Sequence, residues 1–131
     1  MSETLPMSLW LDLLGKPFKA GARGPEAYDC VGVLLAIQHR LGHPLPAYTS
    51  DLWGLAAARG DTWDRVTDPK PGDAILIRSS SPPWHVGVVC GGGYMIHAHC
   101  DAGAVTRVRY DAHPWHKRIE GFYRWNRRNI K

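Results

Sequence analysis

A run of three glycines, Gly91-Gly92-Gly93, separates two segments of β-type sequence and constrains the fold more than any other feature of the chain. Trp84 to Cys90 and Tyr94 to His99 are rich in aromatic and β-branched residues, and glycine reaches positive φ without a steric penalty. The pattern predicts an antiparallel hairpin with all three glycines in its loop, and one apolar face that is turned to the core. The pairs on that face are Cys90 with Tyr94, Val88 with Ile96, and Val86 with Ala98.

The opposite face of the hairpin carries three histidines, His85, His97 and His99. Because side chains alternate along a strand, this register puts His99 directly opposite His85. It makes His97 the diagonal neighbour of His85, about 7–8 Å away by Cα. A core does not need three imidazoles on one face, so we interpret them as a candidate catalytic cluster. A two-residue loop would put His85 and His97 on opposite faces and remove the cluster.

Cys30 supplies the nucleophile that such a cluster needs. Residues 16–29 form a loop rich in glycine and proline, and the apolar residues after Cys30 recur at helical spacing, so Cys30 is expected at a helix N-terminus. A thiol attacks only as its thiolate, and a helix N-terminus and a nearby imidazole both lower its pKa. We therefore predict a cysteine hydrolase in which His85 takes the Cys30 proton and returns it to the leaving amine. Either His97 or His99 would hold the imidazole in the required tautomer.

The remaining segments predict the α+β class with an antiparallel sheet, because helices precede strands rather than alternate with them. A short helix is expected near residues 9–14, and a second one runs to Gly60 from a cap at Thr49, Ser50 or Asp51. Further strands are expected at Ala74–Ile77, Ala104–Tyr110 and Glu120–Trp125. A chain of 131 residues is expected to form a single domain, residues 1–131.

The composition of the chain indicates where the protein is made and which kinds of partner it can bind. Met1 to Leu14 has neither a basic n-region nor a long apolar run, so we expect no signal peptide, no membrane span and synthesis in the cytoplasm. Three cysteines are an odd number, and in the reduced state that we expect, Cys90 and Cys100 are interpreted as small buried hydrophobes. The net charge of +4 gathers near the C-terminus and is interpreted as a solvated basic tail, with an anionic partner as the alternative. The predicted partners include neither nucleic acid nor a membrane.

Zinc is the competing interpretation of the histidines, because His97, His99, Cys100 and Cys30 all belong to ligand types. The sequence has no CxxC or HExxH spacing. A His-x-His-Cys run on a strand also sends alternate side chains to opposite faces. We therefore predict no metal and no other cofactor.

Several of these residues fall into blocks that resemble one known family. The five blocks, in chain order, are Leu14–Phe18, Tyr28–Gly32, Pro71–Asp73, His85–Val88 and Ile96–Ala98. They lie between about Trp10 and Val105 and resemble the NlpC/P60 cysteine peptidases, as does the 12-residue distance from His85 to His97. The resemblance implies a papain-like α+β fold with N-terminal helices packed on an antiparallel sheet. It also implies hydrolysis of γ-D-glutamyl–diamino-acid bonds in peptidoglycan stem or cross-bridge peptides.

Carried over residue by residue, the resemblance makes Cys30 the nucleophile, His85 the base and His97 the orienting third member, which decides between His97 and His99. It also implies that Asp29 holds the free amine of the first residue of the stem peptide. The local pattern gives Asp29 a second role as a helix N-cap, and the two roles are compatible. We place Trp84, which precedes His85, at the rim of the substrate cleft.

Two positions depart from the family pattern. Val31 replaces the usual serine after the nucleophile, and Phe18 stands where many members carry a tyrosine near the oxyanion site. Loss of one oxyanion donor costs about 10²–10³ in rate. With the closing Arg118–Arg124 segment, these departures resemble the phage-tail and prophage branch, which implies delivery to the bacterial cell wall by a phage-like particle. The alternatives are a tail-assembly or binding module with little turnover, and an acyltransferase or amidase on a related scaffold.

Overall fold

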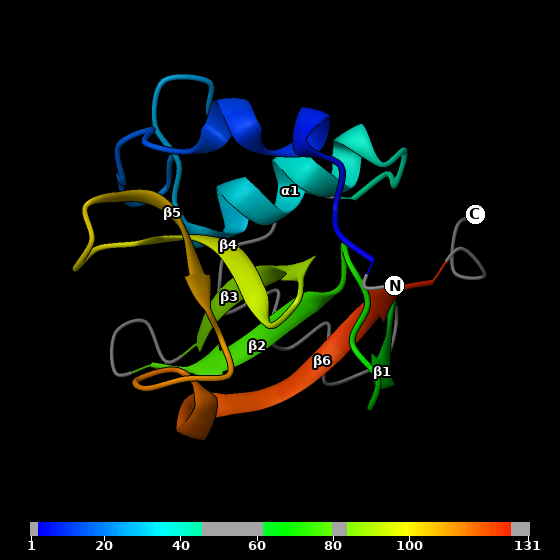
Figure 1. The fold of residues 1–131 in the computed structure, drawn as a ribbon. Helices are drawn as coiled ribbons and strands as arrows, with labels where there is room; N and C mark the ends of the chain where they lie inside the picture. The colour runs from blue at the N-terminus through cyan, green and yellow to red at the C-terminus, as the bar shows by residue number, and fades with distance from the viewer. Residues whose placement is uncertain (1–2, 46–61, 80–83, 127–131) are drawn as a thin grey trace.

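The computed structural model describes residues 3–45, 62–79 and 84–126 (Figure 1). Within these ranges the chain forms one α-helix, three short 3-10 turns and six strands. In chain order the elements are η1 (Met7–Leu9), η2 (Leu11–Leu13), α1 (Cys30–Arg40), β1 (Trp63–Val66), β2 (Ala74–Arg78), β3 (Trp84–Gly91), β4 (Tyr94–His99), β5 (Ala104–Arg109), η3 (His116–Arg118) and β6 (Ile119–Trp125). None of the described helices is long and apolar enough to cross a bilayer.

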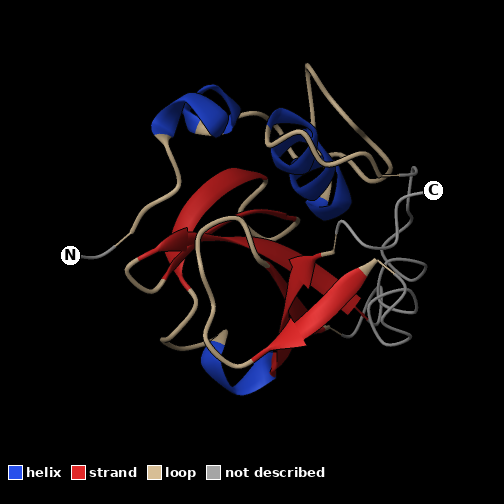
Figure 2. Cartoon of the chain, turned by 90° about the vertical axis from the view of Figure 1, so that its right-hand side faces the viewer, coloured by secondary structure: helices blue, strands red, loops and turns tan. Residues whose placement is uncertain are grey.

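The six strands form one antiparallel sheet in the order β1-β6-β2-β3-β4-β5. Strands β2 to β5 follow one another as a meander, and β6 returns to lie between β1 and β2. Figure 2 shows the sheet curving beneath α1 and the N-terminal turns. The predicted α+β class with an antiparallel sheet is confirmed. The short edge strand β1 was missed by the sequence analysis.

The N-terminal helix predicted near residues 9–14 is instead a pair of 3-10 turns, η1 and η2. Only eight residues lie between Pro6 and Gly15, too few for a stable isolated α-helix. The buried Trp10 ties this segment back on itself through a 2.9 Å hydrogen bond from Nε1 to the Leu5 carbonyl. Among the described residues, α1 is therefore the one α-helix packed on the sheet. The helix predicted to end at Gly60 lies outside the described residues.

The β3–β4 hairpin keeps the predicted register but closes differently. Val88 pairs with Ile96 as predicted, whereas Tyr94 pairs with Gly91 and not with Cys90, so a bulge follows Val89. A bulge places an extra residue in one strand, and here it leaves the side-chain alternation of the strands below it intact. The prediction of a three-glycine loop is therefore wrong, although the histidines stay on one face.

Gly91 explains why the bulge forms at this position. Its φ is +119°, and a Cβ there would collide with the backbone carbonyl oxygen of Glu3. The neighbouring Leu5 N–H donates to the Cys90 carbonyl at 2.7 Å. The N-terminal segment thus lies against the bulge, at a place where only glycine fits.

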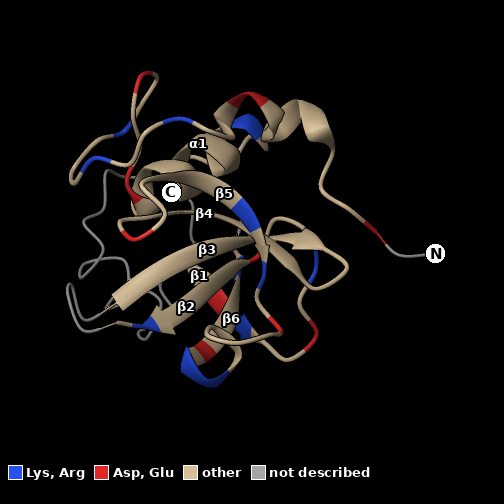
Figure 3. Ribbon diagram, turned by 60° about the vertical axis from the view of Figure 1, so that its left-hand side comes forward, with Lys and Arg blue, Asp and Glu red and all other residues tan. Residues whose placement is uncertain are grey.

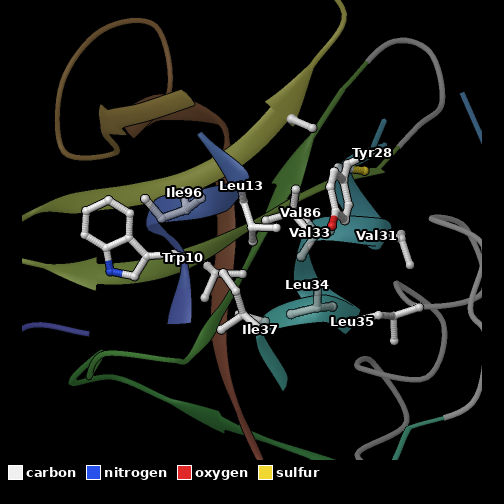
Figure 4. Packing of buried hydrophobic residues seen from close by; sticks show 14 of the residues in the cluster. Trp10, Leu13, Tyr28, Val31, Val33, Leu34, Leu35, Ile37, Val86 and Ile96 are labelled. Carbon is white, nitrogen blue, oxygen red and sulfur yellow. The ribbon is translucent and has the colours of Figure 1, made fainter. Parts of the chain in front are cut away.

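Each face of the sheet packs against its own apolar cluster. On the helix side, Val33, Leu34 and Ile37 of α1 meet Val86 and Ile96 (Figure 4). On the other side, a second cluster lies beneath the segment that connects β5 to β6. Its members are Ile75, Ile77, Val89 and Met95, with Val108, Tyr110, Trp115, Ile119 and Phe122 packed against them. The predicted apolar hairpin face is confirmed, with Tyr94 half-buried at its edge.

Candidate active site

The loop before α1 is fixed to the start of the helix by Asp29. Asp29 is the N-cap, and its Oδ1 accepts the Gly32 N–H at 2.7 Å, as the sequence predicted. Its Oδ2 accepts from Arg23 Nη1 at 2.6 Å and from the Gly21 N–H at 3.1 Å. Both carboxylate oxygens therefore serve the protein's own loop, and Cys30 follows as the first residue of α1.

The two residues after Cys30 are explained by packing. Val31 is fully buried in the helix-side core, where a serine hydroxyl would be surrounded by apolar side chains. A Cβ on Gly32 would lie 2.5 Å from the Ala22 carbonyl oxygen, so this position requires glycine for the loop to approach the helix. The departure at Val31 thus lies in the core. Phe18, the other departure, is half-buried and packs against the same core.

The three predicted histidines lie together on the face of the sheet that is opposite α1. His85 is 5% exposed and His97 is 2% exposed, and His85 Nε2 lies 2.8 Å from His97 Nδ1. The ring of His99 lies 5.0 Å from that of His85, while its Nδ1 accepts the Asp101 N–H at 3.3 Å. Of the two candidates for the third member, His97 is the one hydrogen bonded to His85.

The Cys30 thiol lies against the beginning of β3. The backbone N–H of Val86, the residue after His85, and that of Val31 both interact with the sulfur and favour the thiolate. Burial outweighs them and, together with the negative charge of Asp29, raises the pKa of the Cys30 thiol to about 11. The sequence predicted a thiol with a lowered pKa. Cys30 is 8% exposed, and this burial favours the protonated thiol.

Burial also favours the neutral form of the His85 and His97 imidazoles. Burial lowers the pKa of His85 well below its usual value, and the neighbouring His97 and His99 lower it further. Burial, with His99 next, lowers the pKa of His97 to about 3. If His85 is to accept a proton on Nδ1, its Nε2 must carry the hydrogen and donate to His97 Nδ1. Burial thus favours a neutral thiol against the Val86 N–H and a neutral His85 imidazole that is oriented by His97.

Trp115 covers the histidine cluster and was not singled out by the sequence analysis. Its ring stacks on His85 with centroids 5.6 Å apart and planes inclined by 28°. It meets His97 and His99 edge-on, each at 5.0 Å. Trp84, which the sequence placed at the cleft rim, is half-buried and packs against the helix-side core. No spacing in the sequence links residue 115 to residue 85, because the contact is made by a loop that folds back beneath the sheet.

The positions of the cysteines agree with the predictions except at Cys100. All three cysteines are free, and Cys90 is buried on the helix side as expected. Cys100 is exposed in the turn after β4, so its interpretation as a buried hydrophobe is wrong. In the described part of the chain, the group able to converge on a metal is His99, Cys100 and Asp101, with ligand atoms within 4.8 Å of one another. This group excludes Cys30.

The chain matches known proteins over most of its length. A family model described as the NlpC/P60 family matches residues 15–124. A protein described as a probable endopeptidase p60, from Listeria grayi, is 28% identical over 111 residues, which are 85% of this chain and 20% of that protein. The chain spans about a fifth to about a half of the length of the curated relatives that head the comparison.

Solved structures share the fold. The structure of NlpC1 from Trichomonas vaginalis matches with a TM-score of 0.74 and 26% identity, over 92% of this chain and 43% of that one. The NlpC/p60 domain of the peptidoglycan hydrolase SagA matches with a TM-score of 0.66 and 20% identity, over 90% of this chain and 94% of that one. The second likeness concerns the fold alone.

Proposed function

This chain belongs to the NlpC/P60 family, and from that premise we propose that it is a cysteine endopeptidase acting on peptidoglycan peptides. The proposed bond is the γ-D-glutamyl–diamino-acid linkage of stem or cross-bridge peptides. One observation carries the proposal: the Cys30 thiol at the start of α1 lies against the N–H of Val86, the residue after His85, and the buried His85 is joined to His97 at 2.8 Å. The relative from Listeria grayi, named a probable endopeptidase, agrees with this activity.

The proposed cycle begins with a neutral pair. As Cys30 Sγ attacks the scissile carbonyl carbon, its proton passes to His85 Nδ1, giving an imidazolium whose Nε2–H stays bonded to His97. The imidazolium then donates that proton to the leaving amine, and the C–N bond breaks to leave a thioester on Cys30. A water molecule attacks the thioester with His85 as base, and the released thiolate recovers the proton. Backbone N–H groups at the start of α1 would stabilise the oxyanion.

We also propose that the enzyme reaches the bacterial wall on a phage-like tail particle. The support for this is the sequence resemblance of Val31, Phe18 and the Arg118–Arg124 segment to the phage-tail branch. Peptidoglycan and the particle's tail proteins are then its partners. Asp29 is proposed to meet the substrate amine only where the Arg23 pair is displaced, since both of its oxygens are already bonded.

A second candidate is a tail-assembly or binding module with little turnover. The burial of Cys30, which is 8% exposed and whose thiol pKa is raised to about 11, favours this alternative. A module of this kind would bind peptidoglycan without cleaving it.

Digestion of purified muropeptides followed by mass spectrometry distinguishes these functions. We expect the full chain to cut at the γ-D-glutamyl–diamino-acid bond, Cys30→Ala to be inactive, and Cys100→Ala to match the wild type because Cys100 is exposed and away from α1. Cleavage by Cys30→Ala would exclude the cysteine mechanism. Binding to sacculi without any cleavage by the wild type would establish the binding module instead.

A further inference from the structure

The proposed cycle requires a positive charge on a buried ring. The group hydrogen bonded to His85 Nε2 is His97, a neutral imidazole, whereas in a Ser-His-Asp triad a carboxylate lies in the equivalent place. When His85 takes the Cys30 proton, the cation forms where burial disfavours it. Strands β3 and β4, which hold the three histidines, contain no lysine, arginine, aspartate or glutamate (Figure 3).

Among the described residues, the carboxylates that interact with Cys30 or with the histidines are bonded elsewhere or lie in solvent. Asp29, beside the thiol, is bonded to Gly32 and Arg23. Asp101 lies 3.8 Å from His99 Nδ1, but its side chain is 90% exposed, so water screens it. The imidazolium of His85 therefore needs a stabilising group other than an anion.

Trp115 is placed to supply that stabilisation. Its indole ring is stacked on His85, with centroids 5.6 Å apart, within the range in which a cation is attracted to a tryptophan face. The ring packs against the apolar cluster beneath the sheet. The backbone N–H of Trp115 donates to the Ala112 carbonyl at 3.0 Å, which fixes the turn that carries the ring.

We infer that Trp115 is a positioning residue that acts through His85: its ring face stabilises the imidazolium, in place of a carboxylate, and so favours the Cys30 thiolate–His85 imidazolium pair. The inference rests on the proposed function for the role of His85 as the base. The charge balances, because one proton leaves Sγ and arrives at Nδ1. The chain would thus use an aromatic face where other triads use an anion.

Other groups around His85 could affect the same equilibrium and are left unchanged by the test. Cys30, at the start of α1, lies against the N–H of the neighbouring Val86, and His97 and His99 face His85 from β4. On β2, the residue paired with His85 is the apolar Ile77. Arg118 and Asp101 line the pocket that adjoins Trp115, with opposite charges.

The test measures the thiolate of Cys30 directly and needs no peptidoglycan. The rate of iodoacetamide modification of Cys30 is followed by peptide mapping from pH 5 to 11 in the full chain, Trp115→Phe and Trp115→Leu. Leucine keeps an apolar cover but has no ring face, and phenylalanine has a weaker one than tryptophan. At pH 7 we expect the rate to fall in the order tryptophan, phenylalanine, leucine. The leucine variant should lose about 2- to 30-fold at pH 7, while its rate at pH 11, where hydroxide rather than His85 takes the proton, stays close to that of the wild type.

Trp125→Leu is the matched control. Trp125 stacks on His43 with centroids 4.0 Å apart, so this variant removes another tryptophan–histidine stack and should leave Cys30 modification unchanged. Equal or faster modification of Trp115→Leu at pH 7, or an equal fall at every pH, would overturn the inference. If circular dichroism shows that the leucine variant is unfolded, the phenylalanine variant decides, and a rate equal to wild type overturns the inference. Muropeptide cleavage is measured separately, so failure of the proposed function would not be confused with failure of this inference.

Discussion

Replacement of Asp29 tests how strongly the loop before the nucleophile is fastened to the helix. In Asp29→Ala the N-cap bond to Gly32 is lost, which costs about 1 kcal/mol. The part-buried pair with Arg23, whose side chains are 16% and 32% exposed, adds about 1 kcal/mol. We therefore expect a loss of about 2 kcal/mol, or about 6–10 °C in Tm for a domain of this size. Asp29→Asn keeps an acceptor for the cap and should lose about half as much.

Thermal and urea unfolding of these variants provide the measurement, with Asp12→Ala as the control. Asp12 forms a comparable ion pair with Arg40 at the other end of α1, but it is 64% exposed and caps no helix. Its loss should cost less than about 1 kcal/mol. If Asp29→Ala is no more destabilising than Asp12→Ala, the cap and the buried pair do not fasten the loop, and the reasoning is refuted.

Three further changes have expected outcomes. Because burial lowers the pKa of His85 and His97, the unfolded chain binds more protons than the folded chain once the pH falls below about 6.5. The contribution of these two rings to the free energy of unfolding is fully present above that pH. It should fall by up to about 1.4 kcal/mol per pH unit for each ring as the pH drops toward 3. Equal stability in urea unfolding at pH 7 and at pH 5 would contradict this prediction. Gly91→Ala should lose about 1–3 kcal/mol in urea unfolding, because alanine at φ +119° is strained against the N-terminal segment, whereas Gly103→Ala, with open space around it, should lose less. Val31→Ser should lower Tm by several degrees without raising the rate of muropeptide cleavage, since this side chain lies in the core; a faster enzyme would show that the hydroxyl acts in the site.

The features that the sequence predicted are those set by local pattern. Strand alternation, together with the register that pairs Val88 with Ile96, puts His85, His97 and His99 on one face. The Asp29 cap is a contact between residues three apart. The hairpin closure was missed because a run of three glycines can be divided between loop and strand in two ways. The choice depends on Glu3, which is far away in the sequence and packs against Gly91.

The electrostatic state of the site could not be predicted for a related reason. A helix N-terminus and an imidazole both favour a thiolate, and both are readable from the sequence around Cys30. The burial that reverses their effect comes from packing between α1 and the sheet, which no spacing records. Trp115 is hidden in the same way, because it reaches the histidines from a connection between β5 and β6.

The position of the site at the ends of two elements follows from the alternation of side chains. Val86 points into the helix-side core, so the ring of its neighbour His85 must emerge on the opposite face of the sheet. A thiol carried by a helix on one face and an imidazole on the other can approach each other only around the end of a strand. His85 is the second residue of β3, and Cys30 is the first residue of α1. A histidine further along β3 would be separated from the thiol by the backbone of the sheet, however well the two were spaced in the sequence.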